Sequence, residues 1–254
     1  MAHPPAPSVA EPEPLITPRV LAGLSVTALV QAALVVGCVW PGWDLFAAEA
    51  LPASLAAAAL SLSLLLAPAW NSDPRAHDDV LLLQNGRYVF LSLWQAAAFA
   101  FFLLVSARVT TLSGDAILRA SLILGGAAWL ALTVSRRWPR AYLGLVLFWV
   151  VAIPMAAFVV AEVFISTPNG SMGWSRAKGP GVETFRNTVE WLLRFSPGTA
   201  IIGALQGRLP GDASCGWREA GLFAGGGALL GFLLQWIGPW RPADRTETAD
   251  LMGP

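Results

Sequence analysis

The segment VETFRNTVEWLLRFSPGTAIIGALQ, residues 182–206, is apolar enough to enter a membrane but is broken in its middle. Neither half is long enough to cross a bilayer, because a transmembrane helix needs about 20 consecutive apolar residues. Ser196 and Pro197 can end one helix and begin another, since serine caps helix starts and proline fits the first helical position. The pattern predicts a short helical hairpin that dips into one face of the membrane.

The first half of this segment is amphipathic. Its apolar residues recur at helical spacing, and its charged residues take the other faces of the helix. The apolar set is Val182, Phe185, Val189, Leu192 and Leu193. The pattern predicts a helix lying in the membrane interface. A loop helix on the outer surface, with no further role, explains the same pattern equally well.

The composition of the whole chain indicates an integral membrane protein. Of its 254 residues, 56% are hydrophobic and only 13% are charged, whereas soluble domains carry about 25% charged residues. The formal net charge is zero, so no basic surface points to nucleic acid. The bilayer itself is therefore the first expected partner.

Long apolar runs dominate the rest of the chain, and each is close to the length of a membrane span. They lie at about residues 19–40, 51–70, 88–107, 116–134, 142–165 and 220–237. The sequence therefore predicts an all-α polytopic membrane protein with six transmembrane helices, plus the hairpin at 182–206 between the fifth and the sixth. One membrane domain, residues 19–240, is expected between tails at 1–18 and 241–254.

Arginine placement predicts the orientation, because short cytoplasmic loops carry an excess of basic residues. One side of the predicted bundle has eight arginines: Arg19, Arg75, Arg87, Arg136, Arg137, Arg140, Arg241 and Arg245. The short loops of the other side carry only Arg108 and Arg119. Both termini are expected in the cytoplasm, and the protein in a bacterial inner membrane.

A short cytoplasmic helix is predicted at residues 74–84. Asp73 can cap it, Pro74 fits its first position, and Asn85 and Gly86 can end it. Arg75, Asp78 and Leu82 are its candidate contacts with a partner protein. The alternative interpretation is an early start of the third transmembrane helix.

No catalytic motif occurs in the chain, whether HExxH, GxSxG, a P-loop or CxxC. We therefore expect no catalytic residues, no cofactor and no metal site. Glu162 is a candidate functional residue, because carboxylates within membrane spans are costly and often functional. Cys38 and Cys215 are both expected near the outer face, where a disulfide between them could persist; two free thiols are the alternative.

Residues 195–205, FSPGTAIIGAL, are similar to a Ser-Pro-centred stretch between the fifth and sixth helices of type-2 ABC exporter permeases. The chain resembles that family in three further respects: six spans with cytoplasmic termini, a short helix in the first cytoplasmic loop, and paired short helices before the last span. Many members carry an acidic-basic, Gly-Thr-containing segment before the third span, where this chain has DPRAHDD at residues 73–79.

The resemblance implies a permease subunit that forms a translocation path with a second copy or a paralogous subunit. A separate ATPase subunit would drive it from the cytoplasm, and the chain itself would not be an enzyme. The alternative is a non-catalytic structural or assembly subunit of a larger membrane complex.

Overall fold

The computed structural model describes residues 17–39, 50–71, 81–107, 110–152, 155, 187–188, 191, 193–207 and 216–236. Every regular element in this part of the chain is helical. The first helices are α1 (Pro18–Val39), α2 (Leu51–Asn71), α3 (Leu81–Ser106) and α4 (Gly114–Arg137). They are followed by α5 (Pro139–Leu147), the π-helix η2 (Phe148–Ala152), α8 (Pro197–Gln206), α9 (Trp217–Gly221), the π-helix η4 (Leu222–Gly226) and α10 (Gly227–Trp236).

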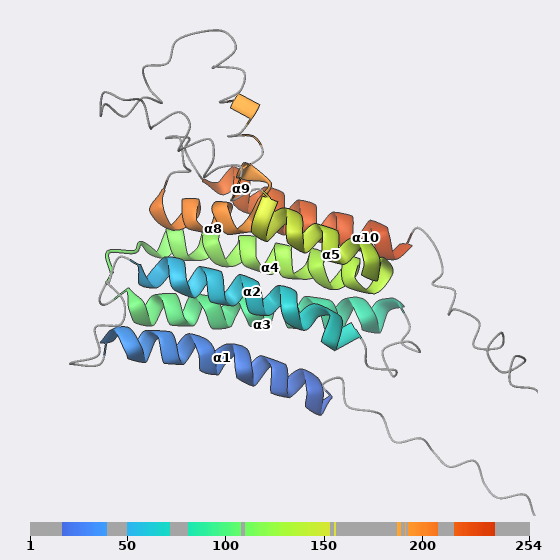
Figure 1. The fold of residues 1–254 in the computed structure, drawn as a ribbon, viewed down its shortest axis with the longest axis horizontal. Helices are drawn as coiled ribbons and strands as arrows, with labels where there is room; N and C mark the ends of the chain where they lie inside the picture. The colour runs from blue at the N-terminus through green and yellow to red at the C-terminus, as the bar shows by residue number, and fades with distance from the viewer. Residues whose placement is uncertain are drawn as a thin grey trace, which may run out of the picture.

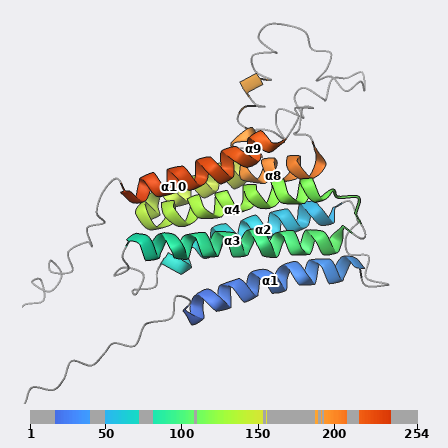
Figure 2. The same ribbon diagram turned by 180° about the vertical axis from the view of Figure 1, so that it is seen from behind.

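The helices form a bundle with nearly parallel axes and α4 in the middle (Figure 1). Helices α2 and α3 lie on one side of α4, with α1 at that edge, and α5, α8 and α10 lie on the other side (Figures 1 and 2). We call the end of the bundle that holds Pro18, Asn71 and Arg137 the inner end, because the arginine pattern predicts that it faces the cytoplasm. The opposite end, at Val39 and Gly114, is the outer end.

Four helices in the described part of the chain, α1 to α4, are long and apolar enough to cross a membrane. The all-helical membrane class is therefore confirmed. The predicted fifth span overlaps α5 and η2, and the sixth overlaps a continuous helical run over residues 217–236 that contains the π-helix. Within the described residues neither is an unbroken α-helix long enough to cross a membrane, so the count of six stays a prediction.

One predicted boundary is wrong. Helix α3 begins at Leu81, and Asn85 and Gly86 lie inside it rather than ending a separate helix. A Cβ at Gly86 would meet nothing within 4 Å, so this glycine is not placed there by close packing. The early start of the third transmembrane helix, which was the alternative interpretation, is what the structure shows for residues 81–84.

The centre of the bundle is built on close backbone contact between α4 and the last helical run. A Cβ added to Gly126 would lie 2.0 Å from the carbonyl oxygen of Phe223. One added to Gly227 would lie 2.8 Å from the carbonyl oxygen of Gly126. Small residues allow such approach, and in lipid, where burial of apolar surface gives no advantage, close packing is a main source of helix association.

A polar cluster joins three helices at the inner end. The Asn71 side-chain amide donates to the Leu132 carbonyl at 2.7 Å and to Ser135 Oγ at 2.6 Å. The Tyr88 hydroxyl donates to Asn71 Oδ1 at 2.7 Å. Because Asn71, Tyr88 and Ser135 belong to α2, α3 and α4, their buried hydrogen bonds fix the ends of these helices against one another.

Candidate functional site at the Ser196–Pro197 corner

The predicted break at Ser196 and Pro197, which we call the corner, is the start of α8. Ser196 is the N-cap residue, with extended backbone, and Pro197 occupies the first helical turn. Gly207 ends the helix in the left-handed conformation, with φ of 76°, which glycine adopts at little cost. The backbone preferences of Pro197 and Gly207 therefore suit the two ends of the helix.

Helix α8 is buried in the bundle and does not lie on its surface. Pro197, Ala200, Ile201 and Ala204 are among its buried residues. It packs against α4 and α2, alongside the half of α4 that begins at Gly114 (Figure 1). Its ten residues span about 15 Å, which is half of a bilayer core of about 30 Å.

The corner itself lies near the middle of the bundle. A Cβ on Gly198 would be 3.4 Å from Leu60 Cδ2, and Leu60 is near the midpoint of α2. Ser196 is fully buried, and its hydroxyl donates to the Trp149 carbonyl in η2 at 3.4 Å. The chain therefore turns at mid-depth and α8 returns toward the outer end.

The Ser196 side chain does not cap α8, which differs from the expectation. Its hydroxyl donates to η2, and no side-chain cap bond is made at the helix start. The turn is held instead by the next hydroxyl: Thr199 Oγ1 donates to the Leu193 carbonyl at 2.5 Å and to the Ser196 carbonyl at 3.1 Å. Ser196 thus joins the corner to the fifth helical segment.

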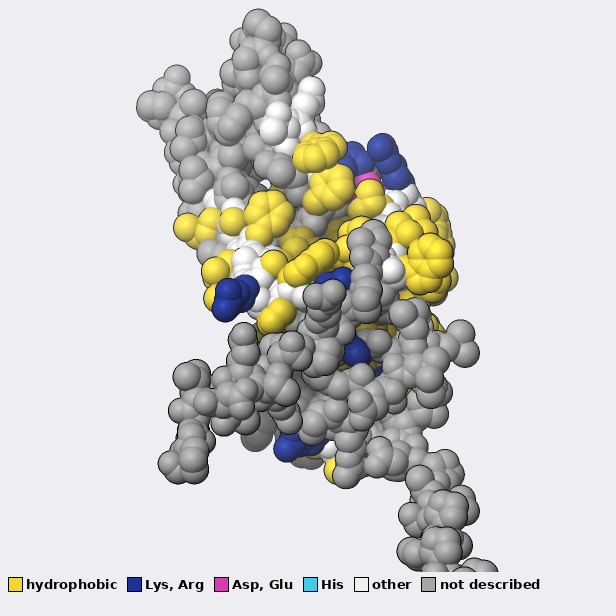
Figure 3. Space-filling view, turned by 90° about the vertical axis from the view of Figure 1, so that its right-hand side faces the viewer, with side chains coloured by type: hydrophobic (Ala, Val, Ile, Leu, Met, Phe, Trp, Pro, Cys, Tyr) yellow, Lys and Arg dark blue, Asp and Glu magenta, His cyan; other side chains and the backbone are white. Residues whose placement is uncertain are grey.

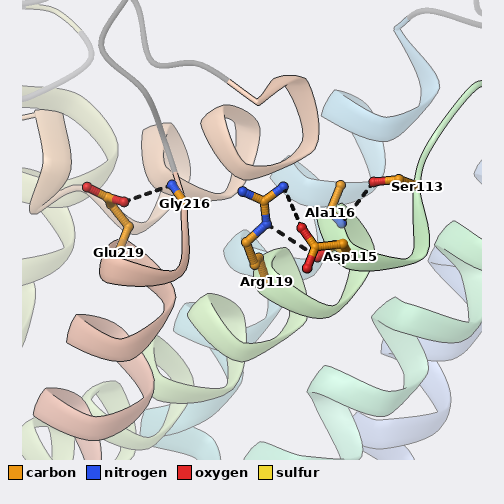
Figure 4. Close-up of polar contacts among 6 residues, drawn as sticks. All are labelled: Ser113, Asp115, Ala116, Arg119, Gly216 and Glu219. Atoms are coloured by element: carbon orange, nitrogen blue, oxygen red, sulfur yellow. Dashed lines mark hydrogen bonds and ion pairs between the residues drawn. The ribbon is translucent and has the colours of Figure 1, made fainter.

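An ion pair joins the corner to the last helical run. Arg194, two residues before Ser196, contacts Glu219 of α9 at 2.6 Å. The Glu219 side chain is 5% exposed and that of Arg194 is 27% exposed. The second carboxylate oxygen of Glu219 accepts the Gly216 backbone N–H at 2.9 Å (Figure 4). With both oxygens bonded, this carboxylate can hold the corner in place.

A second ion pair stands close to the first, at the start of α4. Arg119 contacts Asp115 at 3.0 Å, and the Ser113 hydroxyl accepts the Ala116 N–H at 3.2 Å (Figure 4). Asp115 is 52% exposed, whereas Glu219 is nearly buried. A Cβ at Gly216 would lie 3.9 Å from Arg119, so the two paired groups share one region of the outer half.

Most of the residues singled out from the sequence lie outside the described part of the chain. These are Arg75, Asp78, Glu162 and Cys215. Leu82 lies in the first turns of α3. Cys38 is half-buried near the end of α1 and packs against the core. The partner contact, the role of Glu162 and the Cys38–Cys215 disulfide therefore stay predictions.

Sequence reasoning missed the Arg194–Glu219 pair and the Asn71 cluster. Glu219 directly precedes the apolar run at residues 220–237, and this position was the one available signal. Nothing in the sequence pairs it with Arg194, 25 residues earlier. Asn71, at the end of an apolar run, resembles an ordinary helix stop, and only the packing of α2 against both α3 and α4 gives it partners.

Comparison with known proteins finds no matching family model, no matching curated protein and no matching solved structure. Within the described residues, no group of three or more His, Cys, Asp or Glu side chains could hold a metal ion.

Proposed function

We propose that this chain is the membrane-spanning permease subunit of an ATP-driven exporter. It would form a translocation path with a second copy or a paralogous subunit, and a separate cytoplasmic ATPase would power it. Its place would be a bacterial inner membrane, with six spans and both termini in the cytoplasm. The chain would supply the path and the moving parts, and the ATPase would supply the chemistry.

The observation that carries this proposal is the buried half-length helix α8. A helix that starts at mid-depth and ends at the outer end crosses only half of the bilayer, so it does not serve as a transmembrane anchor. Broken helices inside membranes occur where the backbone is enclosed by protein or lines a water-filled path. The corner also matches the sequence feature that resembles the exporter permeases, residues 195–205.

The contacts of the corner favour the interpretation that it moves during transport. It is attached to the fifth segment through the Ser196–Trp149 hydrogen bond and to the sixth through the Arg194–Glu219 ion pair. Each of these segments has a π-helix next to the attachment, η2 at residues 148–152 and η4 at 222–226. Single π-turns are frequent at functional sites in helices, because they interrupt the regular hydrogen-bond ladder.

The test is purification of the tagged full-length chain from its own cells in mild detergent, with and without nucleotide. Mass spectrometry should identify an ATPase among the co-purifying proteins, and the complex should hydrolyse ATP. The double variant Arg75→Ala/Asp78→Ala should weaken recovery of the ATPase. Arg140→Ala, which removes an exposed arginine from the same end of the bundle, should leave recovery unchanged.

Absence of an ATPase in every nucleotide state would remove the exporter proposal. The structural or assembly subunit would then replace it, and the proteins that do co-purify would identify the complex. Orientation is tested separately with a reporter that is active only in the periplasm. It should give signal when fused after Gly42 and none after Arg137.

A further inference from the structure

Three neutral polar side chains lie inside the bundle, away from the arginines at its inner end. They are Gln31 of α1, Ser63 of α2 and Gln95 of α3, and each is at most 2% exposed. Figure 3 looks onto the inner end, where basic side chains lie between hydrophobic ones. Polar groups that are buried between membrane helices need hydrogen-bond partners in the protein, because lipid tails supply none.

Gln31 and Ser63 lie at nearly the same depth in the bundle. Nearer the inner end, the Trp70 indole packs against the Gly23 backbone, and a Cβ added to Gly23 would lie 2.7 Å from the indole nitrogen. Gln31 follows Gly23 by eight residues, and Ser63 precedes Trp70 by seven. Because α1 and α2 run in opposite directions (Figure 1), both intervals lead toward the outer end. At 1.5 Å per residue they reach about 12 Å and about 10 Å.

Gln95 reaches the same depth from α3. The Ser63 hydroxyl contacts Gln95 Oε1, and it also lies 2.7 Å from the Ala59 carbonyl oxygen of its own helix. A hydroxyl has one hydrogen, so it cannot donate fully to both oxygens. Helix α1 contacts both α2 and α3. The buried side chain of Gln31 therefore lies in the seam of the three helices, within about one helical turn of Gln95 along the bundle.

The amide groups in this seam lack partners. Neither Nε2 nor Oε1 of Gln31 has a hydrogen-bond partner within the described structure, and the same holds for Nε2 of Gln95. All three atoms are fully buried, so the space beside them does not admit a water molecule. Two side-chain amides are complementary, because each offers N–H donors and an acceptor oxygen. The partner that each amide lacks is therefore available in the other.

Helix α1 is the element whose movement would bring the two amides together. It lies at the edge of the bundle (Figures 1 and 2). The Thr27 hydroxyl, one turn before Gln31, donates to the Gly23 carbonyl at 3.0 Å and so bonds within α1. A close-packed seam lets a long side chain reorient only when the helices shift. In lipid, such a shift costs little where the contacts are apolar, since lipid tails replace them.

We propose that Gln31 and Gln95 form an amide lock between α1 and α3, and that the described arrangement is the open state of this lock. In the closed state, Gln95 Nε2 donates to Gln31 Oε1 and Gln31 Nε2 donates to Gln95 Oε1. The Ser63 hydroxyl then donates to the Ala59 carbonyl alone. A shift of α1 on α2 and α3 converts one state into the other, as in other switches built from packed helices. The lock does not depend on the proposed export function.

The experiment compares melting temperatures of the full-length chain in neutral detergent for Gln31→Met, Gln95→Met and the double variant. Methionine has a similar size but no amide, so the seam stays filled. Each single variant should melt at a lower temperature than the unmodified chain. The double variant should lose little more than the larger single loss, because the second substitution removes an amide that has already lost its partner. A higher melting temperature of Gln31→Met would overturn the proposal, as would losses that simply add.

Thr27→Val is the matched control on the same buried face of α1, because its hydroxyl bonds within its own helix. Its effect should add to that of Gln95→Met, and equal coupling to Gln95→Met would overturn the lock. Hydrogen exchange gives a second measurement that does not need the double variant. Gln31→Met should speed amide exchange in α1 and leave α4 unchanged, whereas an equal increase in both helices would mean a general loss of stability and would also overturn the lock.

Discussion

Helices α3 and α4 are almost equally apolar, yet they occupy opposite environments. Their most hydrophobic windows have mean hydropathies of 2.0 and 1.8, but 33% of the α3 window is buried and 61% of the α4 window. Hydropathy therefore identifies both as membrane helices without showing which one is central. In lipid, moving an apolar side chain from the surface to the interior gains little free energy, so another property must determine which helix is central.

That property is side-chain size. The buried residues of α4 include Gly126, Ala127, Ala128 and Ala131. The exposed residues of α3 include Phe90, Trp94, Phe101 and Leu104. Small residues let neighbouring backbones approach α4 from several sides, whereas the large side chains of α3 keep neighbours at a distance and suit contact with lipid tails.

The largest expected effect is at the contact that makes α4 central. Gly126→Ala places a Cβ 2.0 Å from the Phe223 carbonyl oxygen, which is backbone and cannot rotate away. We expect the free energy of unfolding to fall by about 3 kcal/mol or more, because overpacking against rigid atoms forces helices apart. Size-exclusion yield and melting temperature in detergent measure it. Gly144→Ala, which meets nothing within 4 Å, is the control, and equal melting of the two variants would contradict the close contact.

The next effect concerns the polar cluster that fixes α3 and α4 to α2. Asn71→Leu removes bonds to Leu132, Ser135 and Tyr88 and leaves buried partners unpaired. We expect about 2 kcal/mol of destabilisation, the usual effect of leaving buried polar groups without partners. Unfolding by a denaturing detergent measures it. Ser25→Ala, an exposed serine bonded within its own helix, should change little, and Tyr88→Phe should not add fully to Asn71→Leu.

A smaller effect is expected at the ion pair of the corner. Glu219→Gln keeps the bond from Gly216 but leaves Arg194 without its charged partner. Because Arg194 is 27% exposed, we expect Glu219→Gln to destabilise the protein by about 1 to 2 kcal/mol. Breaking a fully buried ion pair costs about 3 to 5 kcal/mol. The double variant Arg194→Gln/Glu219→Gln should recover part of the loss. Asp115→Asn breaks the more exposed pair, Arg119–Asp115, and should destabilise the protein less. A larger loss of stability from Asp115→Asn than from Glu219→Gln would contradict the prediction that the more buried pair contributes more.

The smallest effect is expected on the lipid-facing side of α3. Phe101 is 58% exposed and Phe99 is fully buried, so one helix offers two phenylalanines in different environments. Phe99→Ala is the buried control and should destabilise the protein much more than Phe101→Ala, because it leaves a cavity. Phe101→Ala should cost less than about 1 kcal/mol, since lipid replaces the lost contacts. Similar melting of the two variants would show that α3 is covered on both faces.

Part of the candidate site could be predicted from the sequence because its signals are local. Ser196, Pro197 and Gly207 set the ends of α8 through backbone preferences that act within a few residues. The ion pair could not be predicted, because Arg194 and Glu219 meet only through the folding of the chain between them. The wrong helix end at Asn85 and Gly86 has the same origin, since a weak local stop signal loses to a continuous apolar helix.

The sequence alone determined that this is a helical membrane protein, where its first four long helices lie, and that residues 196–207 form a separate short helix. Apolar run length decides the first two, because the bilayer demands about 20 residues with every backbone group bonded internally. Only the tertiary structure decided that α4 is central and that α8 starts at mid-depth. Those facts depend on which surfaces fit together closely, and fit is a property of pairs of helices rather than of one segment.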